Sequence, residues 1–196
     1  MPLGGPHRIC AGMRILLTLP FAAGLFAAGL VAPAMGQTRP AHPPAKPAAK
    51  PSSNAPKLIG NFEDWRAATH AEAGATVCYA FTKVQSSTPV LPGRGDVVLT
   101  VTERPSGRDA VAITAGFAYP SGAEVVVSVD KTELAFYTSA RSAFARDGKA
   151  VTVAFDKGRT AVAKSPGPKA LAVADTFSLR GFSAAYAAIN KACPAK

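Results

Sequence analysis

The sequence has 196 residues, a formal charge of +10 and three cysteines, a length that allows one ordinary domain with appendages. Six of the 22 basic residues but none of the 12 acidic residues precede Leu58, so the chain from Leu58 onward carries only +4. No stripe of lysine and arginine alternates with aromatic residues, and this argues against a nucleic-acid partner.

Residues 1–36 are predicted to be a signal peptide. Arg8 and Arg14 supply a positive N-terminal region, residues 15–32 are mainly apolar, and Ala34-Met35-Gly36 precedes the expected cleavage site. An uncleaved anchor is the alternative, because about eighteen apolar residues just span a bilayer, but glycines and a proline interrupt this stretch. We expect a periplasmic protein without stable membrane insertion after cleavage, with outer-membrane association or secretion as further options.

Residues 37–57 are rich in proline, alanine and lysine and contain no large apolar residue. Such a segment cannot bury a core and is predicted to be an extended linker, with a reach of roughly 60 Å at about 3.1 Å per residue. A simple spacer is one interpretation. Salt-sensitive attraction of its basic residues to anionic envelope polymers is the other.

Two cysteines, Cys78 and Cys193, remain after the signal peptide is removed. In an oxidising periplasm they are expected to form a disulfide, and closing so long a loop stabilises a fold by about 4 to 5 kcal/mol in the chain-entropy model. Two buried free thiols are the weaker alternative there. No histidine or further cysteine stands at zinc-ligand spacing, so we expect neither a metal nor another cofactor.

Residues 58–196 are predicted to form an all-β domain, an antiparallel sandwich or barrel-like fold closed by one short C-terminal helix. Short alternating runs rich in β-branched residues are separated by turn residues at regular intervals. A helix is expected over 184–193, with Ser183 as its N-cap and Tyr186, Ile189 and Cys193 on one face. The expected strands are 62–69, 76–83, 97–102, 110–117, 124–129, 133–137, 151–155, 160–163 and 171–179.

Four residues are candidates for a binding surface, each with a structural alternative. Asp64 and Trp65 would form a recognition site if the indole is exposed, although the sole tryptophan of a small β domain usually lies in the core. Arg104 would hold an anion, or would pair with Glu103 or Asp175 at a strand end. Asp175 begins the last strand motif and completes the set.

Enzymatic signatures are weak. His70 could act as a base with Ser86 or Ser183 as the nucleophile and Asp175 as the orienting residue, but no nucleophile-elbow motif is present. Arg94-Gly95-Asp96 matches an adhesion tripeptide, although a glycine between charged residues is also common in hairpin turns.

Five motifs together resemble the invasion-associated locus B family, a group of exported proteins of alphaproteobacteria. The resemblance covers roughly residues 60–193 and includes both cysteines. It implies an envelope or secreted role, named for host-cell invasion in pathogenic members, and it supplies no catalytic residues. The motifs are Phe62-Glu-Asp-Trp65, Cys78-Tyr79-Ala80, Val101-Thr-Glu-Arg-Pro105, Ala115-Gly-Phe-Ala-Tyr-Pro120 and the stretch from Asp175 to Cys193.

The sequence departs from the family pattern at two places. Residues 164–174 lack the Arg-Gly-Thr-like stretch of the family, and Phe144 stands where the family tends to have tryptophan. The leading hypothesis is a non-enzymatic module that binds an envelope or host-cell surface component. The second is a structural envelope protein that rests on anionic polymer through its basic linker, and the third is a periplasmic hydrolase.

Overall fold

The computed structural model describes residues 55–195. The predicted signal peptide and most of the predicted linker lie outside these residues, and Lys57, assigned to the linker, begins the first strand. The described chain contains two α-helices, α1 (Gly148–Lys157) and α2 (Phe182–Ala192), and the short 3₁₀ turn η1 (Pro168–Ala170). Its strands are β1 (Lys57–Phe62), β2 (Trp65–Glu72), β3 (Ala75–Lys83), β4 (Ser86–Thr88), β5 (Val98–Arg104), β6 (Gly107–Thr114), β7 (Glu124–Val129), β8 (Thr132–Ser139), β9 (Ser142–Ala145), β10 (Thr160–Pro166) and β11 (Ala172–Ser178).

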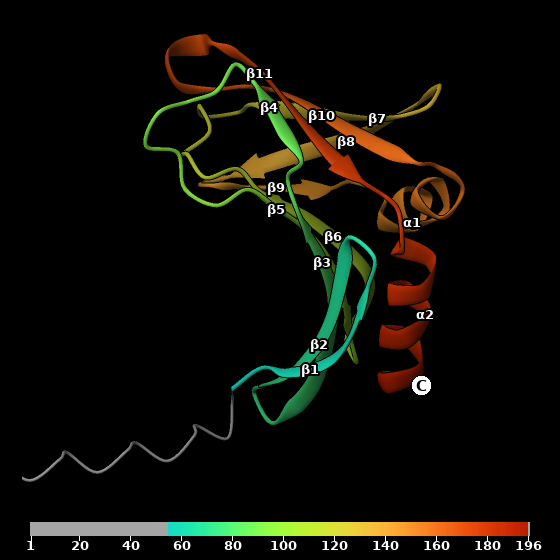
Figure 1. Cartoon of the computed structure of the whole chain (residues 1–196). Coiled ribbons are helices and arrows are strands. Elements are labelled where there is room, and N and C mark those ends of the chain that lie inside the picture. The colour runs from blue at the N-terminus through green and yellow to red at the C-terminus, as the bar shows by residue number, and fades with distance from the viewer. Residues whose placement is uncertain (1–54, 196) are drawn as a thin grey trace, which may run out of the picture. The chain divides into compact units, whose positions relative to one another are not determined.

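All eleven strands belong to one antiparallel sheet, in the order β1-β2-β3-β5-β6-β9-β8-β7-β10-β11-β4. The sheet is strongly curled (Figure 1). Its last strand, β4, follows β3 directly in the chain, but these two strands do not pair, so the sheet is not closed. The predicted all-β, sandwich-like fold is confirmed. The predicted strand 62–69 corresponds to β2, which begins only at Trp65, because the chain turns at Glu63, whose φ is 48°, after β1.

The core lies on the inner face of this curled sheet. Strand β5 shows the pattern: Leu99, Val101 and Glu103 are buried, whereas the residues between them are only partly covered. This alternation is typical of antiparallel sheets with one packed face and one open face. The largest fully buried side chains are Trp65, Phe136, Phe155, Phe177 and Phe182.

The predicted C-terminal helix is confirmed as α2. It buries Phe182, Ala185 and Ile189 against β1, β2 and β3, and the ring of Phe182 meets that of Trp65 edge-on at 4.9 Å. The predicted N-cap, Ser183, is wrong, because the cap is Gly181. Gly181 has a φ of 84°, and a Cβ there would lie 2.0 Å from the Phe62 carbonyl oxygen, so only glycine fits this turn.

The predicted strand 151–155 is also wrong, because these residues lie in α1. The Asp147 side chain accepts a hydrogen bond of 2.9 Å from the Ala150 N–H, which caps the helix. Val151, Thr152 and Phe155 then form one buried helical face. This cap and face prevail over the β-branched composition of the segment. Helix α1 packs against β6 and α2.

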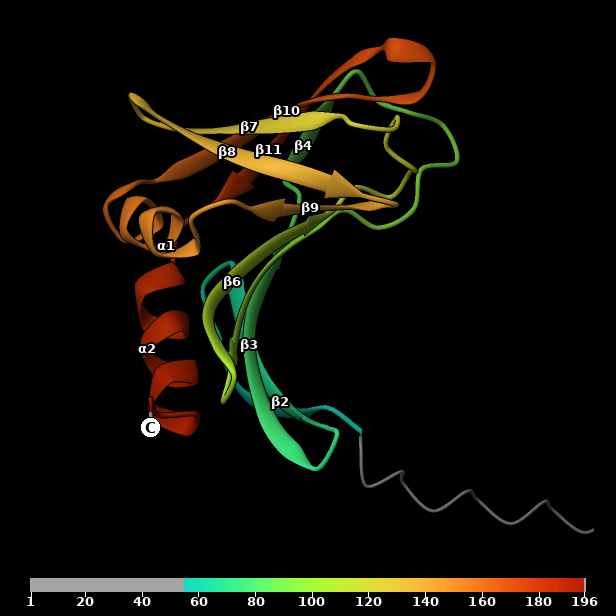
Figure 2. The same cartoon turned by 180° about the vertical axis from the view of Figure 1, so that it is seen from behind.

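Helix α2 covers only one face of the strands on which it packs. In both views it runs beside one side of β2 and β3, and no described helix covers the other side (Figures 1 and 2). The α2 side of β3 carries Cys78 and Ala80, both fully buried, whereas Tyr79 and Phe81 point to the other side. We call this other side of the sheet the open face.

Candidate binding face

Aromatic side chains line up across the open face. The strand pairings place one residue from each of six neighbouring strands opposite one another, because residues paired directly across an antiparallel ladder share a face. We call this set the aromatic row: Arg66, Phe81, Thr100, Ala112, Phe144 and Tyr137.

The row contains two aromatic pairs with small residues between them. Tyr79 and Phe81, two positions apart on β3, stack with ring centroids 5.8 Å apart and planes inclined by 29°. Tyr137 on β8 and Phe144 on β9 stack across the strands at 5.5 Å and 29°. Tyr137 is 45% exposed, and the Arg146 guanidinium lies over its ring, 5.8 Å from the centroid.

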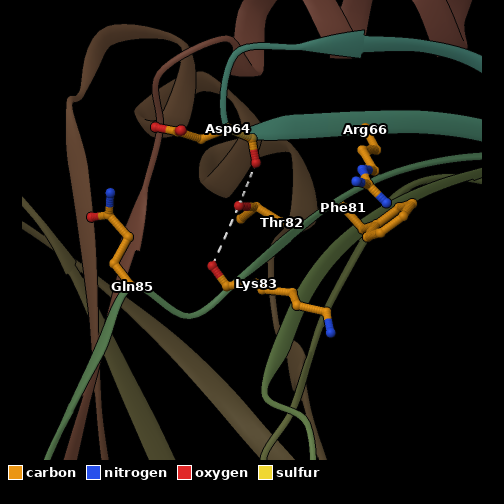
Figure 3. A pocket seen from close by; sticks show the side chains of 6 residues that line it. All are labelled: Asp64, Arg66, Phe81, Thr82, Lys83 and Gln85. Carbon is orange, nitrogen blue, oxygen red and sulfur yellow. Dashed lines mark hydrogen bonds between the residues drawn. The ribbon is translucent and has the colours of Figure 1, made fainter.

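The first aromatic pair lies in a groove formed by two adjoining hollows. One hollow has a volume of about 450 Å³ and is lined by Asp64, Arg66, Phe81, Thr82, Lys83 and Gln85 (Figure 3). The other has a volume of about 630 Å³; besides the Tyr79 ring it is lined by threonines of β5, by Arg104 and by Pro56. Phe81 and Lys83 line both hollows, so the two lie next to each other.

The charges around the groove are mostly paired. Lys83 pairs with Asp96 at 3.4 Å and Arg104 with Glu72 at 3.1 Å. The hydrogen bond from Arg104 holds the pKa of the Glu72 carboxyl below its usual value. Arg66 makes no ion pair with any residue that the structure describes, and its guanidinium points toward the Phe81 ring (Figure 3).

Of the residues predicted for a binding surface, Asp64 and Arg104 lie at the groove, and both already have partners within the domain. The Asp64 carboxylate accepts a hydrogen bond of 2.7 Å from Ser178 Oγ, and its main-chain oxygen accepts one of 2.7 Å from Thr82 Oγ1. Arg104 pairs with Glu72, whereas the sequence suggested Glu103 or Asp175.

Trp65 and Asp175 are not surface residues. Trp65 is fully buried, and its indole N–H donates a hydrogen bond of 2.9 Å to the Ser178 carbonyl oxygen, as the core alternative expects. Asp175 is 2% exposed and accepts two hydrogen bonds of 2.7 Å from the Arg94 guanidinium, one on each carboxylate oxygen. A charged pair so buried and bidentate is a structural anchor.

The arginine of the Arg94-Gly95-Asp96 tripeptide is buried in this structure. Its guanidinium lies 4.8 Å from the centroid of the Phe117 ring and donates a hydrogen bond of 2.6 Å to the Ala115 carbonyl oxygen. With a side chain only 7% exposed, Arg94 is not available to an adhesion partner. Tyr119 lies close to this ion pair, and burial raises its pKa to about 12.

The second buried acid, Glu103, lies beside the cysteine pair, whereas the sequence suggested it only as a partner of Arg104. It is fully buried directly across the strands from Cys78, and the Arg108 Nε lies 2.7 Å from its carboxylate. Burial raises the pKa of Glu103 above its usual value. Arg108 also donates to the Cys193 carbonyl oxygen and to Asn190, so this cluster holds the end of α2.

Cys78 and Cys193 lie at disulfide distance, with Cα atoms 6.0 Å apart, and are bonded in the structure. The bond joins β3 to the residue that follows α2. It therefore closes the end of the chain onto its first long hairpin, formed by β2 and β3.

The residues of the hypothetical catalytic triad are not brought together. The structure pairs His70 with Glu72 at 3.5 Å, whereas Asp175 is engaged by Arg94 and Ser87. His70 lies on the open face, and Ser183 lies on α2, which packs on the opposite face. Among the described residues no group of three or more His, Cys, Asp or Glu could hold a metal ion. None of the described helices is long and apolar enough to cross a membrane.

The aromatic residues of the open face were not among the residues predicted for a binding surface. Tyr79 and Phe81 stand two apart within the predicted strand 76–83, and this spacing places both on one face. The cross-strand neighbours Phe144 and Tyr137 depend on a pairing of β8 with β9 that the sequence did not reveal.

The fold and the site define a class of protein: an antiparallel β domain closed by a disulfide, with an uncovered aromatic groove. A family model described as "Invasion associated locus B (IalB) protein" matches residues 65–190. The chain belongs to this family, as the five motifs suggested.

A solved structure is also similar. The crystal structure of invasion associated protein b from Bartonella henselae matches with a TM-score of 0.50 and 18% sequence identity, over 68% of this chain and 95% of that chain. At this identity the likeness shows a shared fold. A search of curated proteins finds no match.

Proposed function

We propose that this chain is an exported, non-enzymatic binding module of the cell envelope, and that the open face is its recognition surface. The observation that carries the proposal is the groove around Tyr79 and Phe81, which no described helix or strand covers. Membership of the invasion-associated locus B family supports an envelope role. The positive and apolar N-terminal stretch of the sequence supports export.

The partner is an envelope component or a component of the host-cell surface. A protein–ligand site is typically concave and largely apolar, with a few polar groups that fix orientation, and the groove has this composition. Aromatic and arginine side chains carry most of the energy in many recognition surfaces, and the groove offers Tyr79, Phe81 and Arg66.

The test is co-sedimentation of the mature chain with isolated bacterial envelope and with host-cell membranes, at 0.1 M and about 0.5 M salt. We expect salt-resistant binding to one of the two, and a loss of about tenfold in affinity for Phe81→Ala, since truncating an aromatic anchor of a recognition surface costs more than about 1 kcal/mol. Val153→Ala is the matched control, because Val153 is 42% exposed but lies on α1.

The second candidate function is a structural protein held on anionic polymer by its basic segment. The observation in its favour is that residues 37–57 contain four basic residues and no acidic residue. A variant with these four residues changed to Gln separates the two functions. Binding that disappears in this variant and in high salt, but is unchanged in Phe81→Ala, would favour the structural role over groove recognition.

A further inference from the structure

Two loops at one end of the described domain carry exposed apolar side chains. The other large apolar side chains that are exposed in the described chain all lie on strands or helices. Val90 lies in the loop between β4 and β5 and is 82% exposed, and Leu171 lies at the end of η1 and is 44% exposed. Apolar side chains that gather on a surface without packing against the domain favour contact with a partner.

The two loops lie side by side. Thr88, the last residue of β4, pairs with Ala174 of the antiparallel strand β11, so the loop after β4 starts beside the residues that precede Ala174. Leu91 of this loop packs against a small apolar cluster that includes Val173. In both views the loop and η1 lie next to each other at one end of the domain (Figures 1 and 2). We call this pair of segments the tip: residues 89–93 and 168–172.

The tip has a fixed base. The Arg94 main-chain N–H donates a hydrogen bond of 3.3 Å to the Leu91 carbonyl oxygen, and the Arg94 side chain forms the buried ion pair with Asp175. The Arg94 guanidinium also lies over the ring of Phe117, which belongs to the cluster on which Leu91 packs. Because the base is already ordered, docking of the exposed residues on a surface costs little conformational entropy.

The charge around the tip is basic and unpaired. Lys164, Lys169 and Arg141 are exposed and make no ion pair with any residue that the structure describes. Arg141 belongs to this end of the domain, because its guanidinium donates a hydrogen bond of 2.6 Å to the Gly116 carbonyl oxygen. The segments that meet here contain no acidic residue: 86–95, 115–123 and 164–174.

Exposed apolar side chains surrounded by cations match the surface of a bilayer that contains anionic lipids. Apolar side chains enter the boundary between head groups and acyl chains, and basic side chains are attracted to the lipid phosphates. A soluble anionic polymer would satisfy the cations but would offer no apolar layer to Val90 and Leu171. No tip residue lines the groove or the hollows along α1 and α2, so the tip does not offer a concave site to a small ligand.

We propose that the tip is a docking site for a membrane surface that contains anionic lipids. Val90 and Leu171 insert into the interface of the bilayer, and the surrounding basic side chains contact the lipid phosphates. The contact is peripheral and reversible, because two apolar side chains with a few cations are a far weaker anchor than a transmembrane helix. The inference goes beyond the proposed function, since the tip shares no residue with the groove around Phe81.

The test is flotation of the mature chain with lipid vesicles that contain neither protein nor polysaccharide. One set of vesicles is made of phosphatidylcholine alone, and the other also contains phosphatidylglycerol. We expect binding to the anionic vesicles that weakens at high salt, and little binding to the neutral vesicles. The double variant Val90→Ser/Leu171→Ser should lower the affinity for anionic vesicles by about tenfold, because it removes the apolar contact without a change of charge.

The charges and the controls are tested in the same way. Lys164→Gln/Lys169→Gln should lower the affinity by about tenfold at low salt and reduce its salt dependence. Val153→Ser is the matched control for the apolar change, because Val153 is 42% exposed, much like Leu171, but lies on α1. Phe81→Ala should also leave vesicle binding unchanged. The substituted tip residues are exposed, and thermal melting verifies that each variant is folded.

The outcomes separate this inference from the proposed function. Because residues 37–57 also contain four basic residues, each measurement is repeated in the variant with these four changed to Gln. Vesicle binding that disappears in this variant, or that is unchanged in Val90→Ser/Leu171→Ser, would overturn the tip as the docking site. Phe81-dependent binding to isolated envelope without any binding to vesicles would overturn the tip and leave the binding module standing. Tip-dependent vesicle binding, with no effect of Phe81→Ala on envelope binding, would support the tip and contradict recognition by the open face.

Discussion

Two buried acidic residues, Asp175 and Glu103, are each paired with an arginine, but they hold different parts of the domain. Asp175 and Arg94 attach the loop that precedes β5 to β11, with both side chains less than a tenth exposed. Glu103 and Arg108 join the hairpin of β5 and β6 to the end of α2. Neither pair is available to a ligand on the open face, where the exposed rings and Arg66 are the residues proposed for recognition.

Replacing Asp175 with asparagine should destabilise the domain strongly. The Arg94 guanidinium would remain buried without its carboxylate, and breaking a buried ion pair costs about 3 to 5 kcal/mol. We expect urea denaturation of Asp175→Asn to show a loss of about this size in the free energy of unfolding. Asp96→Asn is the control, because it breaks only the exposed pair with Lys83 and should change stability by less than about 1 kcal/mol. Equal losses would contradict a buried anchor.

Glu103 should give the stability of the protein a distinct pH dependence. Burial raises its pKa above the usual 4.5, so the folded state keeps the proton at pH values where the unfolded chain has released it. Stability from this group is fully present below pH 4.5 and is lost as the pH rises through the raised pKa. We expect the unfolding free energy of the wild type, minus that of Glu103→Gln, to fall over this range in urea denaturation. A difference independent of pH would contradict the assignment.

At the scale of elements, the two helices differ in how they begin. Helix α1 starts at a side-chain cap, in which Asp147 accepts a hydrogen bond from the Ala150 N–H. Helix α2 starts at Gly181 without a side-chain cap, and its position is fixed by Phe182 in the core. A side-chain cap and a buried face therefore both support α1, whereas α2 depends on burial without a side-chain cap.

This difference gives a paired prediction. Asp147→Ala should lower the free energy of unfolding by about 1 kcal/mol, the usual value of a lost N-cap. Ser183→Ala should leave it nearly unchanged, because Ser183 is an exposed residue inside α2 and caps nothing. Thermal or urea unfolding of the two variants measures both effects. A larger loss for Ser183→Ala than for Asp147→Ala would contradict the observed helix starts.

The elements also explain how far the sequence predicts this fold. The strands with regular alternation, such as β5 and β7, and the apolar face of α2 follow from local patterns. Helix α1 was mistaken for a strand because Thr152 and Val153 favour β structure, while the deciding contacts are the Asp147 cap and the burial of Phe155.

The candidate site was less predictable than the fold, for a physical reason. Whether Trp65 or Asp175 is exposed depends on α2 and on Arg94, which lie far away in sequence. The aromatic row exists only through the pairings of β6 with β9 and of β8 with β9, and these do not leave a local signal. Single-residue chemistry therefore identified residues at the groove, such as Asp64, together with residues that the structure buries, such as Trp65.

At the scale of the described domain, the curled sheet keeps one face for the core and leaves the other open. The disulfide between Cys78 and Cys193 and the cluster around Arg108 hold α2 on the core side of β3. Tyr79 and Phe81 on the same strand are thereby turned outward. One side of β3 thus packs in the core, and its other side belongs to the face proposed for binding.

Loss of the disulfide should therefore weaken the whole domain. The bonded residues are 115 apart in sequence, and a loop of about this length corresponds to a stabilisation of about 4 to 5 kcal/mol in the chain-entropy model. We expect dithiothreitol to lower the melting temperature of the mature chain clearly. The double variant Cys78→Ser/Cys193→Ser should melt at the lower temperature with or without reductant. A wild-type melting curve that does not respond to reduction would contradict a structural role.

The central claim, that the open face is the recognition surface, is tested most directly by tyrosine labelling. The chain has four tyrosines, of which Tyr79 and Tyr137 lie on the open face and Tyr186 lies on α2, on the opposite side of the sheet. Isolated bacterial envelope and host membranes are each added before a tyrosine-specific reagent, and modification is quantified by mass spectrometry. The account predicts protection of Tyr79 and Tyr137 by one of the two, with Tyr186 unchanged. Protection of Tyr186 while Tyr79 and Tyr137 remain fully reactive would contradict it.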